Sequence, residues 1–261
     1  MSGLLTIENV GISFGGIQAL FGISLDIRAG EIFAVIGPNG AGKTTLFNII
    51  SGVCPPQQGR VLLEGCDVTG LPPHQLARLG LSRTFQNLQI FFRMSAIENV
   101  MVGRHIHEER NVLAHMLALP SVRRQNRQTR ETAGGLLALV GLSDLADTPA
   151  GSLSYGALKR LEIARAVAGE PKILLLDEPA AGCNPVETEE IDEVIKTISG
   201  RGITVVLVEH DMRLVMKISN RIHVLDHGTT LAQGDAATVR SNPAVIAAYL
   251  GNRGTQHSAV G

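Results

Sequence analysis

Gly37-Pro38-Asn39-Gly40-Ala41-Gly42-Lys43-Thr44, with Thr45 directly after it, is the segment from which the architecture of this chain can be worked out. It matches the pattern G-x-x-x-x-G-K-S/T at every fixed position. A phosphate group needs several backbone N–H groups turned onto it at once, and glycines permit the tight turn that does this at the start of a helix. In such a loop Lys43 supplies a cation for the β- and γ-phosphates, and Thr44 supplies a hydroxyl for Mg²⁺. The segment therefore predicts a binding site for nucleotide phosphates.

The residues on either side of this loop support the same interpretation. Ile32–Ile36 is a short apolar run of the kind that forms a strand buried on both faces of a parallel sheet. After the loop, apolar residues at helical spacing continue until Gly52, namely Leu46, Phe47, Ile49 and Ile50. Strand, glycine loop and helix in this order are the context that the motif requires.

Composition limits the classes of protein that the chain can belong to. With 261 residues, of which 44% are hydrophobic, it can bury a core large enough for one big domain or two lobes. The formal charge of −1, from 23 basic and 24 acidic residues, gives no overall field for holding nucleic acid or an anionic membrane. Any such partner would require a local patch.

Cysteine usage and hydropathy indicate the compartment. Cys54, Cys66 and Cys183 fit neither a metal knuckle nor a disulfide framework, so we expect a reducing environment and small buried thiols. The N-terminus lacks a signal-type segment, and no apolar run reaches the roughly 18–20 residues that span a bilayer. We therefore expect a soluble chain whose membrane role, if any, comes through a partner.

Two adjacent carboxylates, Asp177 and Glu178, end the apolar strand Lys172–Leu176. Open α/β sheets place their ligands at the carboxyl ends of the strands, where a purely structural acidic pair would be costly. Neighbouring strand residues point in opposite directions, so the two carboxylates can divide the work. Asp177 is predicted to face the Mg²⁺ held with Thr44, and Glu178 an attacking water.

Weaker candidates each have a plain structural alternative. Phe14 could stack on a purine or could pack inward from its strand, and Gln86 could contact a metal-bound water and a phosphate or could be a surface residue. His210 could bond a terminal phosphate or could be an exposed histidine before an Asp-capped helix. Ser154 and Gly156 open a helix whose N-terminus could face an anion, although many helices begin in this way.

Two further segments have open interpretations. Ile90-Phe91-Phe92-Arg93-Met94 is an aromatic cluster that could belong to the core or could dock a partner. Arg123, Arg127 and Arg130 share a helical face beside Arg124, which favours a solvated surface over a nucleic-acid patch.

The rest of the chain alternates between strand and helix patterns. The expected strands are Leu4–Val10, Ile12–Phe14, Ile23–Ile27, Gly59–Glu64, Leu81–Gln86 and Ile203–Val208, with a hairpin over Ser219–Gly234. The expected helices are Pro72–Leu79, most of Ser95–Leu142 with a break at Pro120, a helix opened by Leu153–Ala157 that ends near Gly169, residues 187–199 and Pro243–Leu250. A polar tail over residues 251–261 should be disordered.

Taken in order, these motifs resemble those of the ATP-binding cassette ATPases over residues 4–250. GPNGAGKT resembles the Walker A motif, Gln86 the Q-loop, LSYGA the signature, ILLLDE the Walker B motif and His210 the switch histidine. The segments RTFQ at 83–86, EPAAG at 178–182 and AYLG at 248–251 look like the ATPase subunits of high-affinity branched-chain amino-acid importers. Related cassettes for urea or amide uptake and for lipopolysaccharide export share much of this narrower pattern.

The resemblance implies a fold and an assembly. The fold would be α/β, a RecA-like P-loop NTPase core with an antiparallel β subdomain and an inserted helical subdomain over about residues 87–168. Two ATPase subunits, identical or closely paralogous, would form a head-to-tail dimer that encloses two ATP molecules. Permease subunits would hold this dimer at the cytoplasmic face of the inner membrane, with a solute-binding protein on the far side, and no nucleic acid is expected.

The resemblance also implies roles for individual residues. Catalysis would fall to Glu178, His210, Gln86 and Lys43, and Mg²⁺ would be held by Thr44, Gln86 and Asp177. The nucleotide would contact Phe14, Gly37, Pro38, Asn39, Gly40, Ala41, Gly42, Lys43, Thr44, Thr45 and, from the opposite subunit, Ser154 and Gly156.

Several residues depart from the general cassette pattern. Tyr155 and Ala157 replace a glycine and a glutamine of the signature, and Phe14 replaces the common adenine-stacking tyrosine. After Walker B, Cys183 and Asn184 stand where leucine and aspartate are usual. A rival hypothesis is a soluble cassette that acts on ribosomes or DNA, but such proteins usually carry tandem cassettes or long coiled-coil insertions, which this chain lacks. A scaffold that does not hydrolyse nucleotide is disfavoured by the intact Asp177-Glu178 pair.

Overall fold

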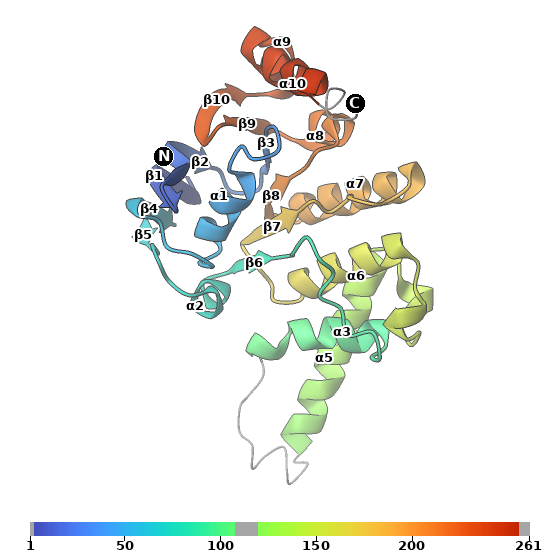
Figure 1. The fold of residues 1–261 in the computed structure, drawn as a ribbon. Helices are drawn as coiled ribbons and strands as arrows, with labels where there is room; N and C mark the ends of the chain where they lie inside the picture. The colour runs from blue at the N-terminus through green and yellow to red at the C-terminus, as the bar shows by residue number, and fades with distance from the viewer. Residues whose placement is uncertain (1–2, 108–119, 256–261) are drawn as a thin grey trace.

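Two β-sheets and the helices around them form the chain in the computed structural model, which describes residues 3–107 and 120–255 (Figure 1). The smaller sheet is antiparallel, with strand order β2-β1-β4-β5. Its strands are β1 (Leu5–Phe14), β2 (Ile17–Ile27), β4 (Gln58–Leu63) and β5 (Cys66–Asp67).

The larger sheet has strand order β10-β9-β3-β8-β7-β6 and is parallel except for β10. Its strands are β3 (Ile32–Ile36), β6 (Leu81–Arg83), β7 (Ile173–Asp177), β8 (Thr204–Val208), β9 (Arg221–Asp226) and β10 (Thr229–Gly234). Every residue of β3, β7 and β8 is buried, as their continuous apolar sequences require in a sheet covered on both faces.

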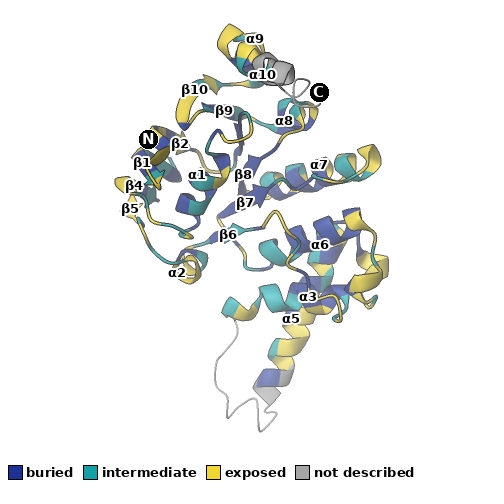
Figure 2. Cartoon of the chain, viewed as in Figure 1, coloured by how far each residue is buried: buried dark blue, intermediate teal, exposed yellow. Residues whose placement is uncertain are grey.

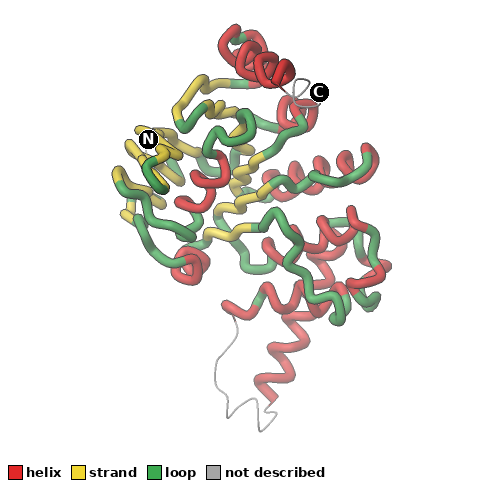
Figure 3. The backbone as a smooth tube through the Cα atoms, viewed as in Figure 1, coloured by secondary structure: helices red, strands yellow, loops and turns green. Residues whose placement is uncertain are grey.

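Helices connect and cover the strands, as the tube view in Figure 3 makes plain. The α-helices are α1 (Lys43–Ile50), α2 (Pro73–Arg78), α3 (Ala96–Gly103), α5 (Pro120–Leu139), α6 (Tyr155–Val167), α7 (Pro185–Gly200), α8 (Met212–Ile218), α9 (Ala236–Ser241) and α10 (Pro243–Thr255). Short 3₁₀ turns are η1 (His105–His107), η2 (Ser143–Leu145) and η3 (Ala150–Ser152).

The core has two parts, one on each face of the larger sheet (Figure 2). On one face, Phe33 and Val35 of β3 pack with Phe47 of α1, which lies between the two sheets. On the other face, Ala34 of β3 packs in a cluster that also includes Ile195 of α7. Alternate residues of one strand thus serve both cores, and α1 is held rigidly below the phosphate loop.

Helices α3, α5 and α6 pack on one another beside the β6 edge of the larger sheet (Figure 1). The buried side chain of Asn99 in α3 accepts from Phe91 N at 2.9 Å and donates to Phe91 O at 3.0 Å and Ser95 O at 3.0 Å. This amide fixes the loop between β6 and α3, which carries Gln86 at its start.

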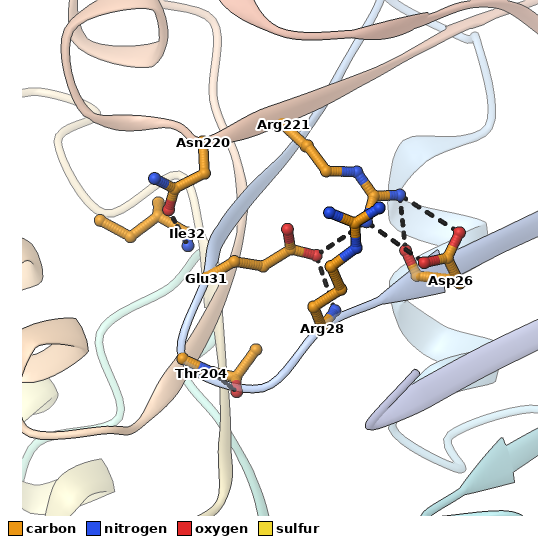
Figure 4. A network of polar contacts seen from close by, with 8 residues as sticks. Asp26, Arg28, Glu31, Ile32, Thr204, Asn220 and Arg221 are labelled. Carbon is orange, nitrogen blue, oxygen red and sulfur yellow. Dashed lines mark hydrogen bonds and ion pairs between the residues drawn. The ribbon is translucent and has the colours of Figure 1, made fainter. Parts of the chain in front are cut away.

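A polar network joins residues at the amino ends of the parallel strands (Figure 4), whereas the phosphate loop follows the carboxyl end of β3. Arg221 lies 3.2 Å from Glu31 Oε1 and from Asp26 Oδ2, and its guanidinium stacks 5.3 Å from the centroid of the Phe33 ring. Thr204 and Asn220 accept from backbone N–H groups at the start of β3, so β2, β3, β8 and β9 are joined here.

Arg221→Met should therefore lower the free energy of unfolding by about 3 kcal/mol, because Glu31 would stay buried without its cation. Urea unfolding followed by circular dichroism measures this change. Arg60→Met is the matched control, since the Arg60–Glu8 pair is exposed and should contribute under about 1 kcal/mol. Equal losses in the two variants would contradict a structural role for the network.

The structure differs from the sequence-based expectations at several element ends. Strand β6 stops at Arg83, so Gln86 lies in a loop and does not end a strand. Helix α10 continues to Thr255, beyond the expected helix end at Leu250. Residues 256–261, and residues 108–119 of the expected helical region, lie outside the described residues. The short helix α9 was not expected; Asp235 caps it by accepting from Thr238 N at 2.8 Å.

Candidate functional site

The phosphate loop joins β3 to α1, and close backbone packing requires two of its glycines, Gly37 and Gly42. Gly37 has φ +152°, and a Cβ at this position would lie 2.1 Å from the carbonyl oxygen of Leu225. Gly42, with φ +100°, is the N-cap residue of α1 and offers no side chain to the first N–H groups of the helix. By contrast, α3, α6, α7, α8 and α9 all have a side-chain cap, while α2 begins at prolines and has none. The amino end of α1 is therefore left open for an anion.

Lys43, the first residue of α1, is buried and bridges the loop. Its Nζ donates to the carbonyl oxygens of Gly37 at 2.7 Å and Pro38 at 3.0 Å. Burial lowers the pKa of the Lys43 ammonium, while the nearby carboxylates of Glu178 and Asp177 raise it. The cation is thus held against the backbone of the loop, beside both acidic residues.

A cavity of about 370 Å³ opens above the loop. It is lined by Ala19, Asn39, Gly40, Ala41, Gly42, Lys43, Thr44, Thr45, Glu178 and His210. The structure thus brings Asn39–Thr45 of the predicted loop together with Glu178 and His210, two predicted catalytic residues that follow β7 and β8. The parallel pairing of β3, β8 and β7 explains this, since it places their carboxyl ends at one edge.

Glu178 is the meeting point of the predicted catalytic groups. Its backbone has φ +51°, a left-handed conformation that is uncommon for a residue with a side chain. One carboxylate oxygen, Oε1, lies 2.6 Å from His210 Nε2, and the other accepts from Gln86 Nε2 at 3.1 Å. Because a carboxylate only accepts, His210 donates through Nε2. Gln86 does not line the cavity itself, but it reaches the site through this bond.

Glu209 is a residue of the site that sequence reasoning missed. It is buried and accepts from Ala180 N at 2.9 Å and from His210 N at 3.0 Å. Burial raises the pKa of this carboxyl, partly offset by the backbone N–H groups that it accepts from. Glu209 joins the loop after Glu178 to the loop that carries His210. The sequence did offer one signal for Glu209, because its carboxylate directly follows the apolar strand Thr204–Val208.

The residues predicted to hold Mg²⁺ offer the oxygen ligands that this ion prefers. Asp177 is buried and uses Oδ2 to accept from Arg83 Nη2 at 2.8 Å, which leaves Oδ1 for another ligand. Thr44 lines the cavity with its side chain exposed, and Gln86 bonds Glu178 through its amide nitrogen, so its amide oxygen remains available. These groups fit a Mg²⁺ ion, which would take its other ligands from the nucleotide and water.

Ser154 and Gly156 lie away from this cavity and are used within the chain. Ser154 Oγ caps α6 by accepting from Ala157 N at 3.3 Å. The buried Gly156 N donates to Glu187 Oε1 at 3.1 Å, and Glu187 also forms a capping box with Asn184. Their contact with a nucleotide on a second subunit stays a prediction, and it would require Glu187 to give up the Gly156 amide.

The sequence did not determine where two aromatic residues, Phe14 and Tyr249, lie. Phe14 is 52% exposed, so the alternative that it packs inward is wrong, although it does not line the cavity. Tyr249 in α10 is hydrogen-bonded by the backbone of Gly37, and burial raises the pKa of its hydroxyl to about 12. The C-terminal helix therefore touches the start of the phosphate loop, a contact that the sequence did not indicate.

The arginine face on α5 is partly neutralised. Arg130 pairs with Asp147 at 2.7 Å, and Arg127 is exposed, while the side chain of Arg123 lies outside the described residues. Within the described part of the chain, no helix is long and apolar enough to cross a membrane.

The fold and the site together define an α/β nucleotide-binding protein of the P-loop class. A family model described as ABC transporter matches residues 20–181, and one described as branched-chain amino acid ATP-binding cassette transporter matches residues 229–254. The chain belongs to the ABC transporter family, as an ATP-binding and ATP-hydrolysing component.

Individual relatives and solved structures agree with this assignment. The chain is 45% identical to the high-affinity branched-chain amino acid transport ATP-binding protein BraF of Pseudomonas aeruginosa, over 95% of this chain and 98% of that protein. It is 44% identical to LivG of Escherichia coli, a protein of the same description, with the same coverage. A solved ATP-binding cassette of an ABC transporter in its ADP conformation matches with a TM-score of 0.84 and 33% identity, over 96% of this chain and all of that one.

Proposed function

We propose that this chain energises the import of branched-chain amino acids, by binding and hydrolysing MgATP as a subunit of an ABC importer. The observation that carries the proposal is the convergence of Glu178, His210 and Gln86 beside the open amino end of α1. The substrate class is supported by the names of the relatives at 44–45% identity and by the family match over residues 229–254.

In this mechanism, the phosphates of ATP lie on the N–H groups of the loop, and Lys43 supplies a cation to the β- and γ-phosphates. Bound Mg²⁺, held by Thr44, Gln86 and Asp177, would neutralise phosphate charge. Glu178 orients a water for in-line attack on the γ-phosphate and accepts its proton. His210 keeps Glu178 in place before the nucleotide arrives and can then donate to the terminal phosphate.

The proposed assembly contains a second ATPase subunit and permease subunits. The cavity is open, so a second copy can complete the γ-phosphate site through its Ser154 and Gly156. ATP would then hold two subunits together, and hydrolysis would release them. The helical region over residues 87–168 would carry this movement to the permease at the cytoplasmic face of the membrane.

A groove of about 480 Å³ between β6 and the helices supports the permease contact. Phe91 lines it and is 48% exposed, with the guanidinium of Arg165 5.7 Å from its ring centroid. The loop from Gln86 to Met94 thus connects the catalytic Glu178 to an exposed aromatic surface. We propose that a segment of the permease occupies this groove.

A photo-crosslinking residue at position 91 should capture a membrane-embedded partner in native membranes. The same residue at position 21 is the control, because Phe21 is also exposed but lies on the antiparallel sheet. Cross-linked products are identified by mass spectrometry of the purified complex. A membrane partner found from position 21 but not from position 91 would contradict the proposed docking groove.

Gene disruption in the native host tests the function itself. Loss of the chain should abolish high-affinity uptake of labelled leucine, isoleucine and valine, and wild-type protein should restore it while Glu178→Gln should not. Uptake of labelled urea is measured in parallel. If urea uptake falls and branched-chain uptake does not, the substrate class is wrong although the ATPase assignment stands.

A further inference from the structure

We propose that Arg83 is a positioning residue for the metal-binding carboxylate of Asp177, a role that rests on the proposed binding of MgATP. Arg83 ends β6 and Asp177 ends the neighbouring strand β7. Arg83 Nη2 lies 2.8 Å from Asp177 Oδ2, and the two side chains are only 7% and 5% exposed. This contact fixes one oxygen of the carboxylate, so that Oδ1 is the oxygen offered to a metal.

The same guanidinium holds the helix that follows the phosphate loop. Arg83 Nη1 donates to Asn48 Oδ1 at 2.8 Å and to Ser51 Oγ at 2.7 Å, and both acceptors belong to α1 or its C-terminal end. One side chain therefore connects Asp177 to the helix whose amino end receives the phosphates. The distance between the metal ligand and the phosphate loop is thereby fixed from behind the site.

An arginine is specifically suited to this position. Its planar fork presents separate donors to Asp177 and to α1, and it lies 5.8 Å from the ring centroid of Phe47 and 5.2 Å from that of Phe85. Among the described residues, Arg83 Nε is buried without a hydrogen-bond partner, so the two outer nitrogens alone set its orientation. A lysine would keep the charge but has one nitrogen and cannot hold both sides in the same geometry.

The chain contains a second arginine, with a side chain that is 16% exposed, that serves as a matched control. Arg221 also stacks on a phenylalanine, Phe33, and pairs with a buried carboxylate, Glu31. Arg221 is the first residue of β9 and lies at the amino ends of the parallel strands (Figure 4), whereas the phosphate loop follows their carboxyl ends. Loss of Arg221 should cost stability without changing the metal dependence of nucleotide binding.

The test compares Arg83→Met, Arg83→Lys, Asn48→Ala and Arg221→Met with the wild-type chain. ATP affinity is measured by titration calorimetry in Mg²⁺ and in EDTA, and the Mg²⁺ concentration for half-maximal hydrolysis is determined for each. We expect Arg83→Met to raise that Mg²⁺ concentration about tenfold or more, as removal of groups behind a metal ligand usually does. Affinity for ATP in EDTA should not change, and Arg83→Lys and Asn48→Ala should show smaller shifts in the same direction.

Three results would overturn the role of Arg83. They are an unchanged or lowered Mg²⁺ requirement, an equal loss of ATP affinity with and without Mg²⁺, and an equal shift in Arg221→Met. If Arg83→Met does not fold, Arg83→Lys and Asn48→Ala decide the question by the same criteria. A wild-type chain whose ATP binding ignores Mg²⁺ would overturn the proposed metal site as well, whereas a metal-dependent wild type with an unaffected Arg83 series would overturn only this inference.

Discussion

Glu178→Gln should lower the rate of ATP hydrolysis by roughly 10²- to 10⁴-fold and leave ATP binding intact. The glutamine has nearly the same shape and keeps the place between His210 and Gln86, where its amide oxygen can accept from one of these two donors. Its amide cannot accept a proton from water. Glu178 lines the cavity but is not part of the phosphate loop, so we do not expect its charge to be needed to hold the nucleotide. ATP should therefore stay bound, and the ATP-bound dimer should stay closed.

Phosphate release measures turnover, and size-exclusion chromatography in the presence of ATP measures the dimer. Glu64→Gln is the matched control, since this carboxylate also contacts a basic side chain, Lys172 at 2.6 Å, but lies on the surface away from the cavity. The control should hydrolyse ATP at the wild-type rate. Unimpaired turnover by Glu178→Gln would remove Glu178 from the mechanism.

Lys43→Ala is expected to weaken ATP binding about 10- to 100-fold, which corresponds to the loss of one or more charge-assisted hydrogen bonds. The variant loses the cation for the phosphates and also the two bonds from Nζ to Gly37 and Pro38 that shape the loop. Both losses weaken the binding of ATP. The effect should therefore appear in the dissociation constant, in contrast to Glu178→Gln, where it appears in turnover.

Calorimetry of ATP binding checks this expectation, with Lys172→Ala as the control because Lys172 is a half-exposed surface lysine. An unchanged affinity for ATP in Lys43→Ala would contradict the proposed role of Lys43 in binding the phosphates.

Burial also lowers the pKa of Lys43 from its ordinary value, so its ammonium loses its proton at a lower pH than an exposed lysine does. Wild-type affinity for ATP should accordingly fall as the pH rises into the alkaline range, and Lys43→Ala should not show this fall.

The signature segment shows where sequence patterns stop being sufficient. LSYGA predicts a helix start that can bind an anion, and the structure has that helix with Ser154 as its cap. The Gly156 amide, however, is taken by Glu187, which lies far along the chain at the start of α7. No spacing rule joins these two residues, because their contact depends on how α6 and α7 pack.

The other residues of the site also fall into two groups, those that a local sequence pattern predicts and those whose role depends on contacts between distant elements. The phosphate loop, the strand before it and the acidic pair after β7 could be predicted because each is a local pattern with a single physical purpose. Arg83 could not, although it was part of a recognised segment, because its partners Asn48, Ser51 and Asp177 come from two other elements. Glu209 was missed for the same reason: its function depends on two loops that only the sheet brings together.

Sequence alone therefore determined the chemistry that this chain carries: the glycine loop with Lys43 and Thr44, the carboxylates of Asp177 and Glu178, and the order of strands and helices around them. Only the tertiary structure decided which groups touch. The order β9-β3-β8-β7-β6 places the ends of five parallel strands side by side. His210 and Gln86 thereby meet on Glu178, and Arg83 meets Asp177. Backbone pairing between strands distant in the chain sets these contacts, and local sequence does not encode the order of strands in a sheet.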